Sequence, residues 1–223
     1  MNNFNEKFDK IFVISLKNNR ERQNYIEKSL NKYNIKFEFF ITEKPNIENI
    51  NILEKEYNLE IIDYNKVNYG CIGCFNSHLK IWKQIIDNSW NNVLIFEDDM
   101  IFNNNEQILQ HIPSDYDIFY FGFEGGKNIP INNYIGYPTK PACTHAYAIS
   151  NKGANLLYKF GIQDIKRNTG LQIQAIDGFL GSFPSAKPYF HYDINRKYNK
   201  YAVLNNLINQ NKTFKSDIQI LRK

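Results

Sequence analysis

The chain has 223 residues, of which 43% are hydrophobic and 22% are charged. This length and composition predict one folded domain with a substantial core and exclude a disordered chain. The 27 basic and 23 acidic residues give a net charge of +4 without a dense basic stripe, which argues against nucleic-acid binding.

The sequence also bears on where the protein works. No apolar run approaches the roughly 20 residues that a membrane span needs, and the opening MNNFNEKFDK lacks the apolar core of a signal peptide. The three cysteines, an odd number, suit a reducing compartment. We therefore expect a cytoplasmic protein with no membrane span, with a place at the membrane surface left open.

The first residues of the chain predict a β-α-β unit. Residues 10–16, KIFVISL, and residues 35–41, IKFEFFI, are short apolar runs typical of strands. Between them, residues 20–32 place Ile26 and Leu30 four positions apart, the spacing of a helix face. Such an opening indicates an α/β domain with a parallel sheet.

The remaining chain continues to alternate between the two kinds of element. We expect helices over residues 47–57, 77–87, 154–160 and 173–180, and strands over 93–96, 117–123 and 145–150. From Pro188 onward we expect short strands mixed with loops. No internal repeat or low-complexity linker interrupts the pattern, so we expect one domain over residues 1–223.

Three consecutive carboxylates, Glu97, Asp98 and Asp99, follow the apolar strand at 93–96 directly. Alternate residues of an extended segment point the same way, so Glu97 and Asp99 can converge while Asp98 faces elsewhere or caps a turn. Carboxylates at the end of such a strand suit Mg²⁺ or Mn²⁺, which can bridge the phosphates of a nucleotide diphosphate. A solvated acidic loop explains the triplet alone equally well.

The stretch GCIGCFNSHLKIW, residues 70–82, contains a C-x-x-C pair formed by Cys71 and Cys74. A zinc site commonly needs four Cys or His ligands, whereas here one pair stands far from Cys143. A thioredoxin-like centre needs a strand before the pair, and VNYG is a poor strand. Both alternatives stay open, but the favoured interpretation is that the sulfurs pack against the fold.

The same stretch predicts how the next helix begins. We expect Gly70 and Gly73 to shape a tight turn, and Asn76 or Ser77 to cap the helix that follows. His78 then falls in the first turn of that helix, where holding the turn by a hydrogen bond is the default role for a lone histidine.

Asp177 lies in the apolar stretch AIDGFL. Burial raises the pKa of a carboxyl group, which would allow it to act as a general base. Spacing alone favours a simpler role as a helix cap or a solvent-facing residue.

Taken in order, these segments resemble glycosyltransferase family 25, the lipooligosaccharide and procollagen galactosyltransferase-like proteins. The matching stretches are VISLKNNRERQNYI, GCIGCFNSHLKIWKQIID, VLIFEDDMIF, YDIFYFG, THAYAISNKGANLL, AIDGFL and QNKTFKSDI. Cys71 stands where the family usually has Glu, so the C-x-x-C pair is a by-product of one substitution. Residues 125–139 match no family motif.

The resemblance implies a single-domain α/β fold of the GT-A type, which binds nucleotide sugars on a mostly parallel central sheet. It also implies a D-x-D-like metal site for Mn²⁺ or Mg²⁺. The implied reaction is inverting transfer of a hexose, most often galactose, from a UDP-sugar to a hydroxyl group on a glycan or a glycosylated protein. A base would take the acceptor proton on the face opposite the departing UDP.

The resemblance also assigns roles to individual residues. Glu97, Asp98 and Asp99 would bind metal and donor, with Asp99 the first choice as a direct metal ligand. Asp177 would be the base or contact the acceptor. Ser15, Leu16 and Arg22 would line the donor pocket, and His78 would support it from behind. His191 and Asp217 are the candidates for a third metal ligand.

Three alternatives accompany this interpretation. The chain could be an inactive relative that binds a sugar or a partner glycosyltransferase, although every acidic motif position is filled. It could use UDP-glucose, which differs from UDP-galactose at one hydroxyl group. It could be a thiol oxidoreductase built on the C-x-x-C pair. The acceptor and the oligomeric state stay open.

Overall fold

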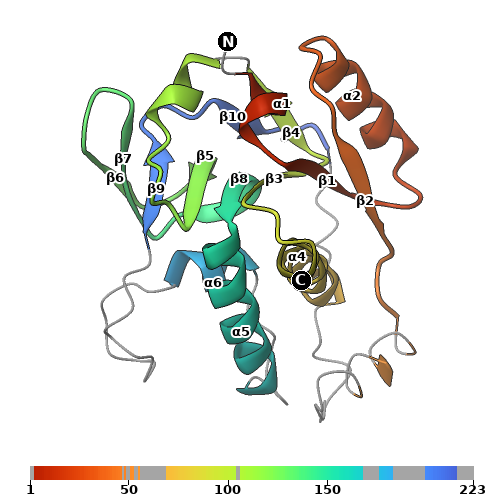
Figure 1. Cartoon of the computed structure of the whole chain (residues 1–223). Coiled ribbons are helices and arrows are strands. Elements are labelled where there is room, and N and C mark those ends of the chain that lie inside the picture. Colours follow the sequence, from red (N-terminus) through yellow and green to blue (C-terminus); the bar gives the residue numbers. More distant parts are fainter. Residues whose placement is uncertain are drawn as a thin grey trace.

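A computed structural model describes residues 3–46, 48, 51–52, 55, 69–103, 106–167, 176–182 and 199–214. Its centre is an eight-stranded sheet in the order β2-β1-β3-β8-β5-β9-β7-β6 (Figure 1). The strands are β1 (Lys10–Leu16), β2 (Glu38–Thr42), β3 (Asn92–Glu97), β5 (Ile118–Glu124), β6 (Lys127–Pro130), β7 (Ile135–Thr139), β8 (Ala142–Ser150) and β9 (Lys200–Val203). A separate antiparallel ribbon joins β4 (Met100–Phe102) to β10 (Ile208–Gln210).

Most strands of the large sheet run in one direction. β1 is parallel to β2 and β3, and β5 is parallel to β9. β8 is antiparallel to β3 and β5, and β7 is antiparallel to β6 and β9. Only β7 and β8 therefore oppose the others within this sheet, and the expected α/β fold with a mostly parallel central sheet is confirmed.

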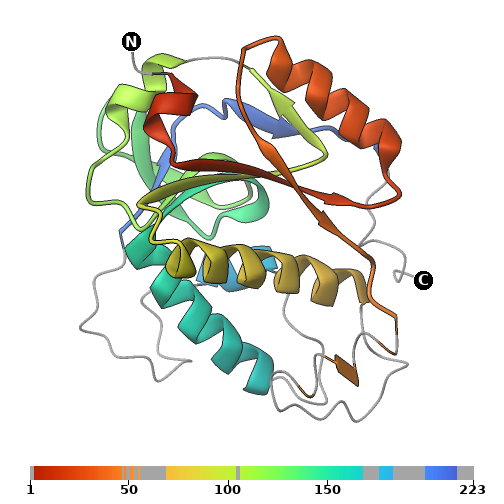
Figure 2. The ribbon, with the colours of Figure 1, turned by 45° about the vertical axis from the view of Figure 1, so that its right-hand side comes forward.

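Helices cover both faces of the sheet. α4 (Tyr69–Asp87), α5 (Asn151–Arg167) and α6 (Ile176–Ser182) pack on one face, where α4 and α5 lie side by side (Figure 2). α1 (Phe4–Lys7), α2 (Arg20–Asn31), the 3-10 helix η2 (Glu106–His111) and the β4–β10 ribbon cover the other. In the described part of the chain, none of the helices has the length and apolar character to cross a membrane.

Two hydrophobic cores follow from this layering. Along β1, Phe12 and Ile14 enter the core beneath α4 and α5, whereas Ile11 and Val13 enter the core beneath α1 and α2. Both sets are buried because side chains alternate between the faces of a strand that is covered on both sides. This explains why β1 and β3 are continuous apolar runs in the sequence.

The second strand begins later than residues 35–41 predict. Asn34 adopts a left-handed conformation with φ of 53°, and the Ile35 N–H donates to the Leu30 carbonyl oxygen at 3.1 Å. Asn34 and Ile35 thus close the end of α2, where a left-handed Asn is common. Pairing with β1 starts only at Glu38.

The expected turn at Gly70 and Gly73 is wrong, because α4 already begins at Tyr69. Ser77 is not a cap, since its hydroxyl donates to the Gly73 carbonyl oxygen within the helix at 2.7 Å. A Cβ atom on Gly73 would lie 2.7 Å from Pro45 Cδ. Gly73 is therefore needed for a close approach between α4 and the segment after β2, and not for a turn.

The other predicted elements have mixed outcomes. The helix expected over residues 47–57 lies largely outside the described residues. The remaining predicted elements appear with shifted bounds, and β9 and β10 are the short strands expected near the end of the chain.

Candidate functional site

A cleft opens where the parallel strands β1, β2 and β3 end. Brought together in its walls are Ser15 and Leu16 from β1, Thr42 from β2, Gly73 and Cys74 from α4, the triplet Glu97 to Asp99, and Arg22 and Gln210. It encloses about 730 Å³, part of which is open to solvent. Ligands of α/β proteins commonly bind at the carboxyl ends of parallel strands, and we call this site the carboxyl-end cleft.

Asp98 ties the end of β3 to β1 and α2. Its Oδ2 accepts a hydrogen bond from Ser15 Oγ at 2.6 Å, and its Oδ1 pairs with Arg22 Nη1 at 2.9 Å. The Arg22 guanidinium also lies over the Phe214 ring at 5.2 Å. Burial raises the pKa of Asp98, and the contacts with Ser15 and Arg22 oppose this effect only in part. Asp98 lies in the turn after β3, and both of its oxygens are already used by Ser15 and Arg22.

Asp99 leaves one oxygen atom without a partner. Its Oδ2 accepts a hydrogen bond from Gln210 Nε2 at 2.8 Å, whereas within the described residues its buried Oδ1 has no hydrogen-bond partner. Burial, followed by the nearby charge of Glu97, raises the pKa of Asp99 to about 7. Two neighbouring carboxylates, one with a buried unused oxygen, fit a cation because oxygen anions are the preferred ligands of Mg²⁺ and Mn²⁺.

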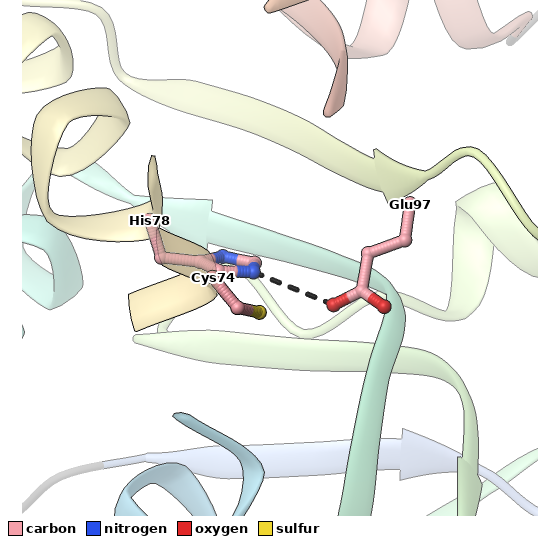
Figure 3. A group of neighbouring side chains, drawn as sticks. All are labelled: Cys74, His78 and Glu97. Carbon is pink, nitrogen blue, oxygen red and sulfur yellow. Dashed lines mark ion pairs between the residues drawn. The ribbon is translucent and has the colours of Figure 1, made fainter. Parts of the chain in front are cut away.

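Glu97 is held by two side chains behind the cleft. The Thr144 hydroxyl donates to Glu97 Oε1, and His78 Nε2 lies 3.4 Å from the same oxygen (Figure 3). Burial alone would raise the pKa of Glu97, but the contacts with His78 and Thr144 outweigh it and lower the pKa. Glu97 therefore stays ionised beside Asp99.

His78 is fully buried and is not part of the cleft wall. Its Nδ1 lies 2.7 Å from the Tyr147 hydroxyl, which also accepts a hydrogen bond from Trp82 Nε1 at 3.0 Å. The ring is thus fixed by β8 on one side and reaches Glu97 on the other. The expectation that His78 holds the first turn of a helix is wrong, because α4 begins at Tyr69 and His78 lies well inside it.

The cysteines do not have the environment of reactive thiols. Cys71, Cys74 and Cys143 are free. Burial raises the pKa of all three thiols, to about 12 for Cys143. Catalytic cysteines have lowered pKa values, so the structure gives a thiol oxidoreductase no support.

Of the remaining predicted site residues, the structure describes Asp177 alone. Asp177 lies in the first turn of α6, where its Oδ2 accepts a hydrogen bond from the Cys143 backbone N–H at 3.4 Å. It is not among the residues that line the cleft. His191 and Asp217 lie outside the described residues.

Two residues at the site were missed by sequence reasoning about roles, namely Thr144 beside Glu97 and Gln210 beside Asp99. They are separated from their partners by 47 and 111 positions. For Thr144, the signal in the sequence is a polar residue at the start of the predicted strand THAYAIS. The structure shows why it matters: β8 runs antiparallel to β3 with Ala146 opposite Phe96, so Thr144 lies near the end of β3.

Comparison with known proteins gives a consistent result. The family model described as "Glycosyltransferase family 25 (LPS biosynthesis protein)" matches residues 8–129. A Haemophilus influenzae protein named "Putative glycosyltransferase" is 31% identical over 161 residues, covering 66% of this chain and 55% of that protein. Procollagen galactosyltransferase 2 of Mus musculus is 28% identical over 172 residues, 67% of this chain and 27% of that protein.

A third relative is the lipooligosaccharide biosynthesis protein lic2B of Haemophilus influenzae. It is 33% identical over 94 residues, which are 42% of this chain and 35% of that protein. The chain thus spans about half of the length of the first relative and about a third or less of the other two.

Proposed function

Because this chain belongs to glycosyltransferase family 25, we propose that it transfers a hexose from a UDP-sugar to a hydroxyl group, with inversion and with the help of Mn²⁺ or Mg²⁺. The observation that supports this most is that Glu97 and Asp99 both line the carboxyl-end cleft, where the buried Asp99 Oδ1 has no hydrogen-bond partner among the described residues. This is where an α/β sheet binds nucleotides, and it has the oxygen ligands that a diphosphate-bound cation needs.

Glu97 and Asp99 would hold the cation. When bound, such an ion supplies positive charge that stabilises UDP as a leaving group. The chain's own contribution is to fix these carboxylates in advance, Glu97 through Thr144 and His78, and Asp99 through Gln210. Fixed ligands reduce the reorganisation that the site needs as charge develops.

Asp98 and Arg22 would shape the nucleotide end of the cleft. Their ion pair is nearly buried, with side chains 8% and 10% exposed, and Ser15 completes it. Because Asp98 already has partners on both oxygens, we assign it to positioning β1 and α2 against the metal-binding carboxylates. Ser15 and Leu16 then form the wall along which the donor would lie.

The proton acceptor for the incoming hydroxyl group is assigned to Asp177 on the family resemblance. An inverting transfer needs a base on the face opposite the leaving group. Asp177 is half-buried in the first turn of α6, where it contacts the Cys143 backbone N–H. Its part in the reaction is therefore a separate proposal from the carboxylate pair.

The names of the relatives suggest the donor and acceptor classes. One relative is named a procollagen galactosyltransferase and another a lipooligosaccharide biosynthesis protein. We propose galactose as the transferred sugar, and a glycan or a glycosylated protein as the acceptor.

A panel of UDP-sugars tests the proposal. The purified chain would be incubated with each UDP-sugar and Mn²⁺, and release of UDP would be scored with and without EDTA. We expect EDTA-sensitive release that is fastest with UDP-galactose, while preference for UDP-glucose would instead identify a glucosyltransferase. UDP-sugar binding without release would indicate an inactive relative, and neither binding nor release would contradict the proposal.

A further inference from the structure

A second group of potential ligands lies directly behind the carboxylate pair. Cys74, His78 and Glu97 each offer one ligand atom, and these atoms all lie within 4.8 Å of one another (Figure 3). The set combines a sulfur, an imidazole nitrogen and a carboxylate oxygen. Zn²⁺ is bound in proteins by this mixture of ligand types, whereas Mg²⁺ and Mn²⁺ prefer oxygen.

The helix α4 sets two of these ligands on one face. Cys74 and His78 are four positions apart in α4, so both side chains project toward the end of β3, where Glu97 lies. Cys71 is three positions before Cys74 and does not belong to the group of ligands.

The histidine is oriented as a ligand would be. His78 Nε2 is buried and, among the described residues, makes no hydrogen bond of normal geometry, although it points at Glu97. Its Nδ1 faces the Tyr147 hydroxyl, whose oxygen also accepts a hydrogen bond from Trp82. Without an ion, Nε2–H faces Glu97; when an ion binds, the ring takes the other tautomer, in which Nδ1–H donates to the Tyr147 oxygen and Nε2 has a free lone pair. Metal-bound histidines commonly donate their other N–H to an oxygen in this way.

The distances suit a tetrahedral ion. Zinc bonds of 2.0 to 2.3 Å at tetrahedral angles place neighbouring ligand atoms roughly 3.4 to 3.6 Å apart. His78 Nε2 and Glu97 Oε1 are already 3.4 Å apart. The sulfur of Cys74 lies within 4.8 Å of both atoms, and because Cys74 and Glu97 line the cleft, water or a ligand in the cleft can supply a fourth ligand.

We infer that Cys74 Sγ, His78 Nε2 and a carboxylate oxygen of Glu97 form a binding site for Zn²⁺. Binding replaces the thiol proton, which leaves to solvent, and the resulting thiolate is neutralised by the ion. The same carboxylates that disfavour a free thiolate here also attract a cation.

The site has a consequence that rests on the proposed function. Glu97 belongs both to this group and to the proposed Mn²⁺ pair with Asp99. Zn²⁺ bound through Cys74 and His78 engages Glu97 and therefore inhibits Mn²⁺-supported transfer.

Cobalt spectroscopy tests the site without any need for activity. Co²⁺ added to the purified full chain should give a thiolate-to-cobalt charge-transfer band and the intense visible bands of tetrahedral coordination, and one equivalent of Zn²⁺ should abolish both. Cys74→Ser should remove the charge-transfer band and weaken Zn²⁺ binding at least about 10-fold, or about 1.4 kcal/mol. Cys71→Ser is the matched control in the same helix and should keep the band.

The outcomes separate this inference from the proposed transferase. The site would be overturned if the natural chain lacked the charge-transfer band or if Cys74→Ser kept it. Thermal unfolding of each variant checks that the variant is folded. Where UDP release is measurable, Zn²⁺ should lower it equally in the natural chain and in Cys71→Ser. Zn²⁺ binding with unchanged release would overturn the inhibition. Absence of release under every condition refutes the transferase, while the cobalt spectrum still decides the metal site.

Discussion

Replacing Arg22 by methionine should destabilise the protein more than replacing a charged residue at an exposed position. Arg22 pairs with Asp98 at 2.9 Å, and the two side chains are only 10% and 8% exposed. Methionine keeps much of the aliphatic volume beside Phe214. It removes the ion pair with Asp98, whose carboxylate keeps the hydrogen bond from Ser15. A buried charge that loses its counterion is strongly destabilising.

The magnitude follows from this burial. Removing one partner of a buried ion pair costs about 3 to 5 kcal/mol. For a domain of this size each kcal/mol lowers Tm by about 2 to 4 °C, so Arg22→Met should lower Tm by roughly 6 to 20 °C. Adding Asp98→Asn should restore much of this loss, because a neutral amide is cheaper to bury than an unpaired carboxylate.

Urea unfolding followed by circular dichroism would measure the natural chain, both single variants and the double variant. Lys17→Met is the control, since the Lys17–Glu43 pair is 64% and 65% exposed and should contribute less than about 1 kcal/mol. A loss below about 1 kcal/mol for Arg22→Met, or no recovery in the double variant, would refute the view that Asp98 is committed to positioning.

Three further changes probe other parts of the account. Gly73→Ala should cost about 1 to 3 kcal/mol and raise the KM for the donor, because its Cβ would meet Pro45 at 2.7 Å; an unchanged KM would contradict this. Thr144→Val should lower turnover about 10-fold with a stability loss near 1 kcal/mol, since Glu97 loses a hydrogen bond; full turnover would speak against that positioning role. Burial lowers the pKa of Lys200 to about 8, so the folded state releases this proton before the unfolded state does. Relative to Lys200→Met, the natural chain should gain about 1.5 kcal/mol in urea unfolding between pH 8 and pH 9.5, and a flat difference would show that Lys200 is not so perturbed.

The sequence predicted those features that depend on neighbouring residues. The strand at residues 10–16 and the position of the carboxylate triplet at the end of β3 follow from apolar runs in the sequence. The start of α4 could not be predicted, because Gly73 suggests a turn unless its contact with Pro45 is known. That contact is between segments far enough apart that local sequence does not specify it.

At the candidate site too, features set by neighbouring residues were predicted and contacts across the fold were not. The carboxylate triplet is visible as a motif, whereas its partners Thr144 and Gln210 come from β8 and β10, across the fold. The C-x-x-C pair attracted attention as a unit, yet only Cys74 lies near His78 and Glu97. Cys71 lies almost two helical turns before His78 along α4, and this spacing could be applied only after α4 was known to include both cysteines.

Turnover of Asp99→Ala tests the central claim most directly. The variant and the natural chain would be compared for Mn²⁺-dependent UDP release from the preferred UDP-sugar, with thermal unfolding as the check on folding. We predict a loss of at least about 100-fold, because the buried oxygen assigned to the cation is removed. Unchanged Mn²⁺-dependent release from a folded Asp99→Ala protein would contradict the assignment of this cleft as the metal-dependent donor site.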